Sequence, residues 1–190
     1  TRVIGQGKIE FEHLNRNQGL PTNTITAIVQ DKYGMLWLGT QNGLVRFDGY
    51  DYKLYVQDPK DSNSIQNNFI DYLGLANDGD LLIGHKGYGF SIYYIETGVF
   101  QHFRHDPRNP NSLRNDQVIA MYSDPKGIIW IGTNMGLERF DPKSGRFDHY
   151  DIKEAHISRK AAVSSIVQEP DGQLLMYVSG NKIVRFDPRN

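Results

Sequence analysis

The fold is decided by the stretch Gly34-Met35-Leu36-Trp37-Leu38-Gly39-Thr40, which returns further along the chain as Gly127-Ile128-Ile129-Trp130-Ile131-Gly132-Thr133. Weaker copies begin at Gly79 and Gly172, so the four starting points, 34, 79, 127 and 172, are 45, 48 and 45 residues apart. A repeat of this period is typical of proteins assembled from stacked or radially arranged units. The repeat is the strongest signal in the sequence.

Each unit is predicted to form four short strands. In the first unit these lie at 25–30, 35–40, 44–48 and 52–57, with Asn42-Gly43 as a hairpin turn between the second and third. Four antiparallel strands in about 40–50 residues are typical of a β-propeller blade. A β-solenoid is the alternative, but its rungs are shorter and do not carry four strands each. We therefore predict an all-β fold.

The repeats divide the chain into three complete blades and one incomplete blade, within a single domain over 1–190. The expected bounds are 20–58 for blade 1, 65–106 for blade 2, 113–151 for blade 3 and 161–187 for the partial blade 4. The last blade lacks its outer strand. Residues 9–14 resemble the outer strands at 100–103 and 147–150, and they are the expected closing strand.

Two arrangements follow from this incomplete blade. The chain could close as a small four-bladed ring, or it could supply the opening blades of a larger propeller, which we favour because wedge-shaped blades fit a fixed ring size. An isolated piece of a larger ring would expose apolar blade faces and tend to self-associate.

Composition narrows the choice of partners. The 21 basic and 22 acidic side chains leave a formal net charge of −1, which gives no reason to expect nucleic acid or an anionic membrane as partner. The chain has no cysteine, and no apolar run long enough to insert this segment into a bilayer. No cofactor-binding motif, catalytic constellation or metal-ligand spacing stands out, so we predict no cofactor, no metal and no enzymatic activity for this fragment.

The most prominent side chains of the repeat are expected to be structural. Trp37 and Trp130 are predicted to be buried where one blade meets the next, rather than to stack on a ligand. Arg46, Arg139 and Arg185 each precede a Phe-Asp pair. Because they recur, a structural ion pair or turn contact is favoured over recognition of an anion.

The candidate ligand-binding residues gather on one face of the propeller. By the predicted strand order, the hairpins between second and third strands share a face with the linkers between blades. The candidates on this face are Asn23, Asn68 and Asp116, which share one repeat position, and His85, Asn42 and Asn134 in the hairpins. They could hydrogen-bond a sugar or another small polar solute, although turn formation and backbone capping are the favoured roles of the first three. The histidines are expected at the surface.

Beyond these features, Gln30-Asp31-Lys32-Tyr33-Gly34 and its continuation to Gly49-Tyr50 closely resemble the two-component regulator propeller repeat. The linker residues Asp58-Pro59 and Asn63-Ser64, which return at 106–107 and 111–112, also match that family, and the resemblance extends over about 9–187. The second unit departs from the pattern with Leu82 in place of Trp and His85 in place of Thr. The fourth departs at 176–178.

The resemblance implies a periplasmic sensor region of a large bacterial inner-membrane protein. In that family, propellers precede a β-sandwich domain, a membrane span and a cytoplasmic output, usually a histidine kinase or hybrid kinase and sometimes a diguanylate cyclase. Ligands of relatives are often glycan fragments. The expected partners are therefore a carbohydrate or other polar solute, the remaining blades and β-sandwich of the same protein, and a second copy in a homodimer. The expected output is a histidine kinase outside these residues.

Three functions remain open at this point. The first is a ligand-binding segment of a transmembrane sensor, of the kinase or the cyclase type. The second is a scaffold whose propeller face binds another protein or dimerises the receptor. The third, an enzyme of the propeller lyase or hydrolase type, would need clustered acidic, His or Tyr side chains near the axis, and the sequence does not show such a cluster.

Overall fold

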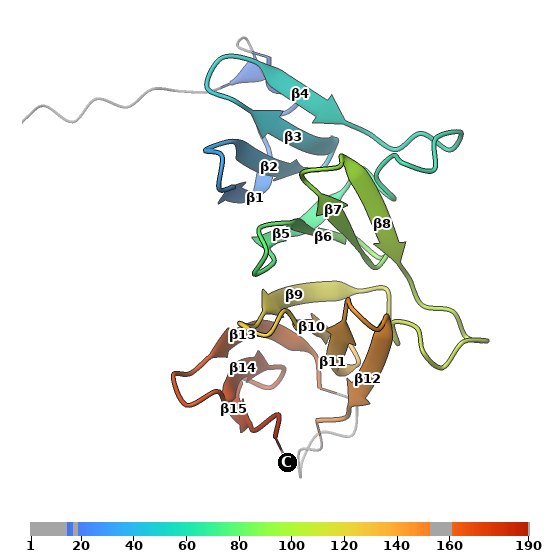
Figure 1. Ribbon diagram of the computed structural model, residues 1–190, viewed down its shortest axis with the longest axis vertical. Helices are drawn as coiled ribbons and strands as arrows, with labels where there is room; N and C mark the ends of the chain where they lie inside the picture. The colour runs from blue at the N-terminus through green and yellow to red at the C-terminus, as the bar shows by residue number, and fades with distance from the viewer. Residues whose placement is uncertain (1–14, 17–18, 153–160, 190) are drawn as a thin grey trace, which may run out of the picture.

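The computed structural model describes residues 15–16, 19–152 and 161–189 of the 190-residue chain. These residues form 15 β-strands in four separate antiparallel sheets. The sheets follow one another in chain order, from the blue first sheet to the red last one (Figure 1). The predicted all-β fold with blade-like sheets is confirmed.

In every sheet the strands lie side by side in the order of the sequence. The first sheet comprises β1 (Ile25–Gln30), β2 (Leu36–Thr40), β3 (Gly43–Phe47) and β4 (Tyr52–Tyr55). The second comprises β5 (Ile70–Leu75), β6 (Leu81–His85), β7 (Phe90–Tyr94) and β8 (Val99–Phe103). The third comprises β9 (Val118–Ser123), β10 (Ile129–Thr133), β11 (Gly136–Asp141) and β12 (Arg146–Tyr150).

The fourth sheet has three strands, β13 (Val163–Gln168), β14 (Leu174–Val178) and β15 (Lys182–Phe186). This confirms that the last blade lacks its outer strand within the described residues. The expected closing strand at 9–14 lies outside the described residues. Within the described part of the chain there is also no helix with the length and apolar character needed to cross a membrane.

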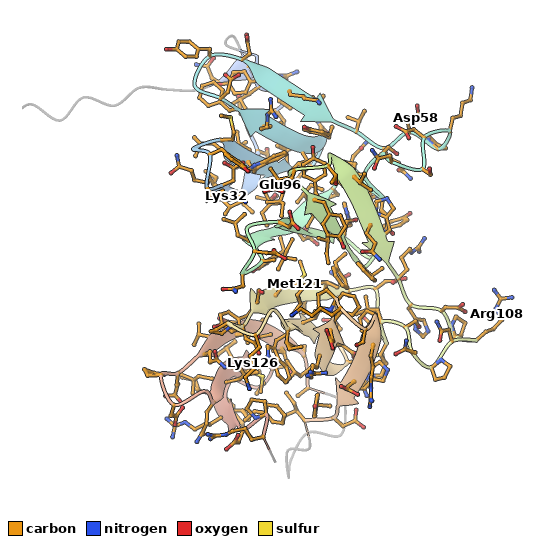
Figure 2. The ribbon with its side chains drawn as sticks, viewed as in Figure 1. Lys32, Asp58, Glu96, Arg108, Met121 and Lys126 are labelled. Carbon is orange, nitrogen blue, oxygen red and sulfur yellow. The ribbon has the colours of Figure 1, made fainter. Side chains whose placement is uncertain are left out.

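The four blades are arranged as an open series. Their innermost strands pack in order, β1 on β5, β5 on β9 and β9 on β13, whereas β1 and β13 do not pack on each other to any comparable extent. Two opposite faces result. The hairpins between second and third strands and the linkers between blades form the linker face, where Asp58 and Arg108 project on the right of Figure 2. The turns between first and second strands form the turn face, where Lys32 lies.

The tryptophans hold neighbouring blades together, as predicted. Trp37 is 1% exposed and belongs to a cluster made largely of residues of the second blade. Trp130 packs in the same way on the fourth blade. The glycine two residues further on allows the close approach: a Cβ on Gly132 would lie 2.4 Å from the carbonyl oxygen of Val163 in the next blade.

The first and last blades each have an uncovered packing face. Leu73, Met121 and Ile166 occupy one repeat position in blades 2 to 4, and all are buried against the preceding blade. The equivalent Ile28 of blade 1 is 64% exposed. At the opposite end, Ile183 is 69% exposed, although its equivalents in blades 1 to 3, Leu44, Phe90 and Leu137, are fully buried.

The repeated arginines differ from one another. Arg139 pairs with Asp148 at 2.9 Å, and Arg185 pairs with Glu169 at 2.6 Å, as expected for structural ion pairs. Arg46 forms neither an ion pair nor a hydrogen bond with the described residues. The expected ion pair is therefore not formed by Arg46, although its charge acts on Asp48 at the start of the following turn.

Candidate functional site

Asn23, Asn68 and Asp116 perform one structural task at equivalent positions. The Oδ1 atom of each accepts a hydrogen bond from a backbone N–H of the preceding segment: that of Arg16 at 3.3 Å, of Gln57 at 2.7 Å and of His105 at 2.7 Å. The side chains therefore fix the path of the chain as it enters each blade. This is the capping role favoured by the sequence.

The same position also joins neighbouring blades through its backbone. The carbonyl oxygens of Asn68 and Asp116 accept hydrogen bonds, both of 2.8 Å, from the N–H groups of Gly43 and Gly89 in the hairpin of the preceding blade. One side-chain oxygen and one carbonyl oxygen of each residue are thus committed to the scaffold. A ligand would meet these residues only through their remaining polar atoms.

The hairpin candidates Asn42 and Asn134 are exposed on the linker face. They occupy different positions, because Asn42 is the second residue of its two-residue turn and Asn134 is the first of the equivalent turn. The backbone N–H of Asn42 donates to Thr40 Oγ1 at 2.9 Å, while that of Asn134 donates to the carbonyl oxygen of Gln117 at 3.3 Å. The side chains of both face solvent, so their role as ligand contacts remains a prediction.

His85 is buried, which corrects the expectation that it lies at the surface. Its side chain replaces the threonine found at this position in blades 1 and 3, and it is fully enclosed. Nδ1 lies 3.0 Å from the carbonyl oxygen of Asn67, and Nε2 lies 2.8 Å from Ser91 Oγ. Both ring nitrogens are engaged, so His85 does not contact a ligand on the linker face directly. It supports Ser91 and, through Ser91, His102.

Burial sets the protonation of this group. Desolvation, aided by the nearby His102, lowers the pKa of His85 from 6.5 to about 4, so the ring is neutral at neutral pH. Because a carbonyl oxygen only accepts, the proton resides on Nδ1, and Nε2 accepts from the Ser91 hydroxyl. Ser91 Oγ, 2.8 Å from His102 Nδ1, then accepts a hydrogen bond from that ring. The carbonyl oxygen of Asn67 thus sets the tautomer of His85 and the direction of its hydrogen bond with Ser91.

This chain of hydrogen bonds ends at a polar pocket on the linker face. The pocket has a volume of about 240 Å³ and lies beneath the linker between blades 1 and 2. Burial lowers the pKa of His102, which keeps this ring in its neutral form. The polar side chains at the pocket wall include Gln57, Asp58, Gln66, Tyr88, His102 and Arg104.

Two of these side chains are prepared to bind a polar group. The guanidinium of Arg104 lies 5.0 Å from the centre of the Tyr88 ring and 3.5 Å from Asp116, which hold it in place while it stays half exposed. Gln66 donates from Nε2 to the carbonyl oxygen of Phe90 at 3.2 Å. Its Oε1 atom is buried and has no hydrogen-bond partner among the described residues. A donor entering the pocket would satisfy that oxygen.

The equivalent region of blade 3 is closed by ion pairs. Arg114, at the position of Gln66, contacts the fully buried Glu138 at 3.2 Å and Asp151 at 2.6 Å, and Glu138 also contacts His149. Burial raises the pKa of Glu138, and its two basic neighbours oppose that shift. In blade 1 the corresponding residues are Pro21, Val45 and Leu54. Blade 2 is therefore the described blade that carries uncharged polar side chains, Gln66, Ser91 and His102, at these three positions.

Sequence reasoning missed Gln66, Tyr88 and Arg104 as members of a site. They could have been found from the way in which the sequence of the second unit differs from the other repeats. Its hairpin at 86–89 is one residue longer than the equivalent hairpins, which places Tyr88 against Arg104. Together the side chains can hydrogen-bond a neutral polar solute. No group of three or more potential metal ligands lies together in the described residues.

Two segments of the repeat match a known protein family. A family model described as two component regulator propeller matches residues 19–42 and 112–135, which contain the beginning of blades 1 and 3. Histidine kinase P4 of Formosa agariphila is 44% identical over 55 residues, which make up 29% of this chain and 4% of that protein. The chain therefore spans a small part of this relative's length.

Solved structures agree on the fold. The extracellular domain of a proposed hybrid two component system from B. thetaiotaomicron matches 94% of this chain with a TM-score of 0.76 and 24% identity. The chain covers 26% of that domain. A virginiamycin B lyase from Staphylococcus aureus matches 88% of this chain with a TM-score of 0.61 and 15% identity, and the chain covers 57% of the lyase. Similarity at this level of identity establishes the propeller-type fold alone.

Proposed function

Because this chain carries two-component regulator propeller repeats, we propose that it is a ligand-binding part of the extracytoplasmic, periplasmic sensor region of a transmembrane two-component signalling protein. The short match to a histidine kinase and the likeness to a two-component extracellular domain support this proposal. The output, a histidine kinase in this proposal, lies outside these 190 residues. Ligand binding by the propeller would change its activity across the membrane.

The observation that carries the proposal is the polar pocket of blade 2. It combines an unsatisfied acceptor, Gln66 Oε1, with a positioned donor group, Arg104, and an aromatic ring, Tyr88. Hydroxyl-rich solutes need donors and acceptors side by side together with an apolar surface. The ligand class that fits is a carbohydrate or another small polar solute. Asn42 on the neighbouring hairpin is a further contact in this proposal.

The uncovered end faces support a larger ring. The exposed Ile28 and Ile183 stand at positions that are buried wherever a neighbouring blade is described. The remaining blades of the same protein would cover both faces, and a β-sandwich domain would follow them. The arrangement as opening blades of a larger propeller is therefore favoured over a closed ring of four.

The proposal is tested by a thermal-shift screen of neutral oligosaccharides and other polar solutes against the complete extracytoplasmic region. A hit should raise the melting temperature in proportion to its concentration, because a ligand that binds only the folded state stabilises it. Affinity is then measured by calorimetry for the wild type, Gln66→Leu and Arg104→Ala. Loss of binding in both variants is expected.

Arg108→Ala is the matched control. Arg108 lies in the next linker, is well exposed and, among the described residues, pairs its side chain with Asp106 alone at 3.6 Å, so its removal should leave binding unchanged. If no solute of a chemically diverse set raises the melting temperature of the wild type, the proposal is contradicted. Equal affinity in the wild type and Arg104→Ala would also contradict it.

A protein-binding or dimerisation scaffold is the second candidate. The observation in its favour is the exposed apolar surface at Ile28, Val167 and Ile183. Cross-linking of the intact receptor that joins linker-face residues of two chains, without any solute effect, would favour this function. The same experiment distinguishes it from the sensor, which requires a solute.

A further inference from the structure

A second cavity lies on the turn face, opposite the polar pocket. It has a volume of about 320 Å³ and lies at the junction of blades 1 and 2. Three aromatic side chains line it, Tyr33, Trp37 and Tyr93, together with the guanidinium of Arg46. Figure 2 shows Lys32 and Glu96, which mark its rim, next to one another at this junction. We call this cavity the Arg46 groove.

Arg46 and Lys53 form a pair of like charges, and neither makes an ion pair with a carboxylate of the described residues, although Asp48 lies close enough to feel the charge of Arg46. They stand directly opposite each other on β3 and β4. Like charges in this arrangement repel and destabilise a sheet. Both cations act on the Tyr93 hydroxyl, where they oppose the burial that raises the pKa of Tyr93 to about 12. Arg46 therefore places a positive charge in the wall of the aromatic cavity, and Lys53, whose Nζ lies 4.8 Å from the centre of the Tyr55 ring, adds its field from outside the lining.

The acidic residues at the groove are already engaged. Glu96 accepts hydrogen bonds from Lys32 Nζ at 3.1 Å and from the Tyr33 hydroxyl at 3.3 Å. Asp31 accepts from the indole N–H of Trp37 at 2.8 Å and from two backbone N–H groups of its own turn. Neither carboxylate forms an ion pair with Arg46. The guanidinium keeps its hydrogen-bond donors available.

The other blade junctions provide internal comparisons. Between blades 3 and 4 a cavity of about 380 Å³ has Trp130 and Arg139 in the same places, but Asp148 stands at the position of Lys53 and neutralises the arginine. Between blades 2 and 3 the arginine is replaced by Ile92, and the cavity shrinks to about 30 Å³. The unneutralised cation is thus specific to the first junction of the described blades.

We propose that the Arg46 groove is an anion-binding site for a small organic anion that carries an apolar ring beside its carboxylate, sulfate or phosphate group. The guanidinium of Arg46 offers a fork of N–H donors to such a group, and Lys53 adds a second charge. Tyr33, which is 55% exposed, offers the surface for the ring, while the buried Trp37 and Tyr93 lie behind it in the cavity wall. The site is separate from the polar pocket, and its binding capacity does not depend on any signalling role.

Phenyl phosphate is the probe, titrated by calorimetry into the complete extracytoplasmic region at pH 7.5 and low salt. Phenol supplies the ring without the charge, and inorganic phosphate supplies the charge without the ring. Saturable binding of phenyl phosphate, tighter than that of either part, is expected. The affinity should fall as sodium chloride is added, because salt screens exposed charges.

Three variants locate the site. Arg46→Gln should weaken binding at least about tenfold, because a hydrogen bond to a charged group contributes that much. Lys53→Asp should have the same effect while raising stability, since it reproduces the ion pair of blade 3. Arg139→Gln removes the equivalent arginine at the junction of blades 3 and 4, where Asp148 neutralises it, and should leave binding unchanged.

Weaker binding together with higher stability in Lys53→Asp separates an effect on the site from an effect on folding. If Lys53 had only a structural role, its replacement would change stability and affinity in the same direction. Absence of saturable binding by the wild type overturns the proposal. Equal losses in Arg46→Gln and Arg139→Gln, or equal affinities for phenol and phenyl phosphate, also overturn it. Unchanged binding by Arg104→Ala would keep this site distinct from the pocket on the linker face.

Discussion

Replacing His85 by threonine should change how the stability of this protein depends on pH. Threonine is the residue that blades 1 and 3 carry at this position, where the hydroxyls of Thr40 and Thr133 pair with backbone groups of their own hairpins. His85 instead holds a buried neutral ring between Asn67 and Ser91. The variant His85→Thr removes a titrating group from the core without introducing a foreign residue type into the repeat.

The direction in which pH changes the stability follows from the lowered pKa of His85. The pKa of His85 is about 4 in the folded protein and 6.5 in the unfolded chain, so between these values the unfolded chain binds more protons. The free energy of unfolding is therefore unaffected by this group above pH 6.5, and it decreases as the pH falls from 6.5 toward 4. Between pH 7.5 and pH 5 the wild type should lose about 2 kcal/mol of stability through this group. The His85→Thr variant should lose none of it.

Urea denaturation followed by circular dichroism at pH 7.5 and pH 5 measures this difference. Titrating groups outside the His85 network, including Glu138, whose raised pKa acts in the opposite direction, are common to both proteins and cancel. His102 is joined to His85 through Ser91, so the difference reports the two rings together. Ile83→Val serves as the control for a core change, because it shortens a fully buried side chain and should cost about 1 kcal/mol equally at both pH values. An unchanged pH dependence in His85→Thr would refute the reasoning.

Three further predictions concern the blade interfaces. Gly132→Ala should destabilise the protein by about 1–3 kcal/mol in urea denaturation, since the added Cβ would meet the Val163 carbonyl oxygen at 2.4 Å; unchanged stability would contradict this close approach. Trp37→Leu, which copies blade 2, should cost about 2–3 kcal/mol by the same assay, because indole burial and the hydrogen bond to Asp31 are both lost. The double variant Ile28→Lys with Ile183→Lys should reduce self-association of the isolated chain in light scattering without lowering its melting temperature, and an unchanged mass distribution in an associating sample would argue against exposed packing faces.

Much of the fold could be predicted because the repeat supplies the same information four times. Trp37 and Trp130 mark the packed interfaces, and the Asn42-Gly43 turn marks a hairpin whose glycine has a φ of 129°. The three-stranded form of blade 4 in the described residues also follows from counting strands within a unit. These features depend on local pattern and spacing, which a sequence records directly.

The candidate site could be predicted only in part, because it depends on contacts between different repeat positions. Asn68 and Asp116 were placed on the correct face, but their oxygens serve the backbone of the linkers. The burial of His85 depends on Ser91 and His102 across two strands. Arg46 looks identical to Arg139 in the repeat, and only the residue opposite on the next strand, Lys53 rather than Asp148, makes them different.

The central claim, that these blades sense a solute, is tested most directly by autophosphorylation of the full-length protein in inside-out membrane vesicles. A binding oligosaccharide from the thermal-shift screen is enclosed on the side that the propeller faces. The account predicts a changed rate of phosphorylation in the wild type and in Arg108→Ala, and no change in Arg104→Ala. A wild-type rate that is indifferent to the bound solute, or an equal response in Arg104→Ala, would contradict it.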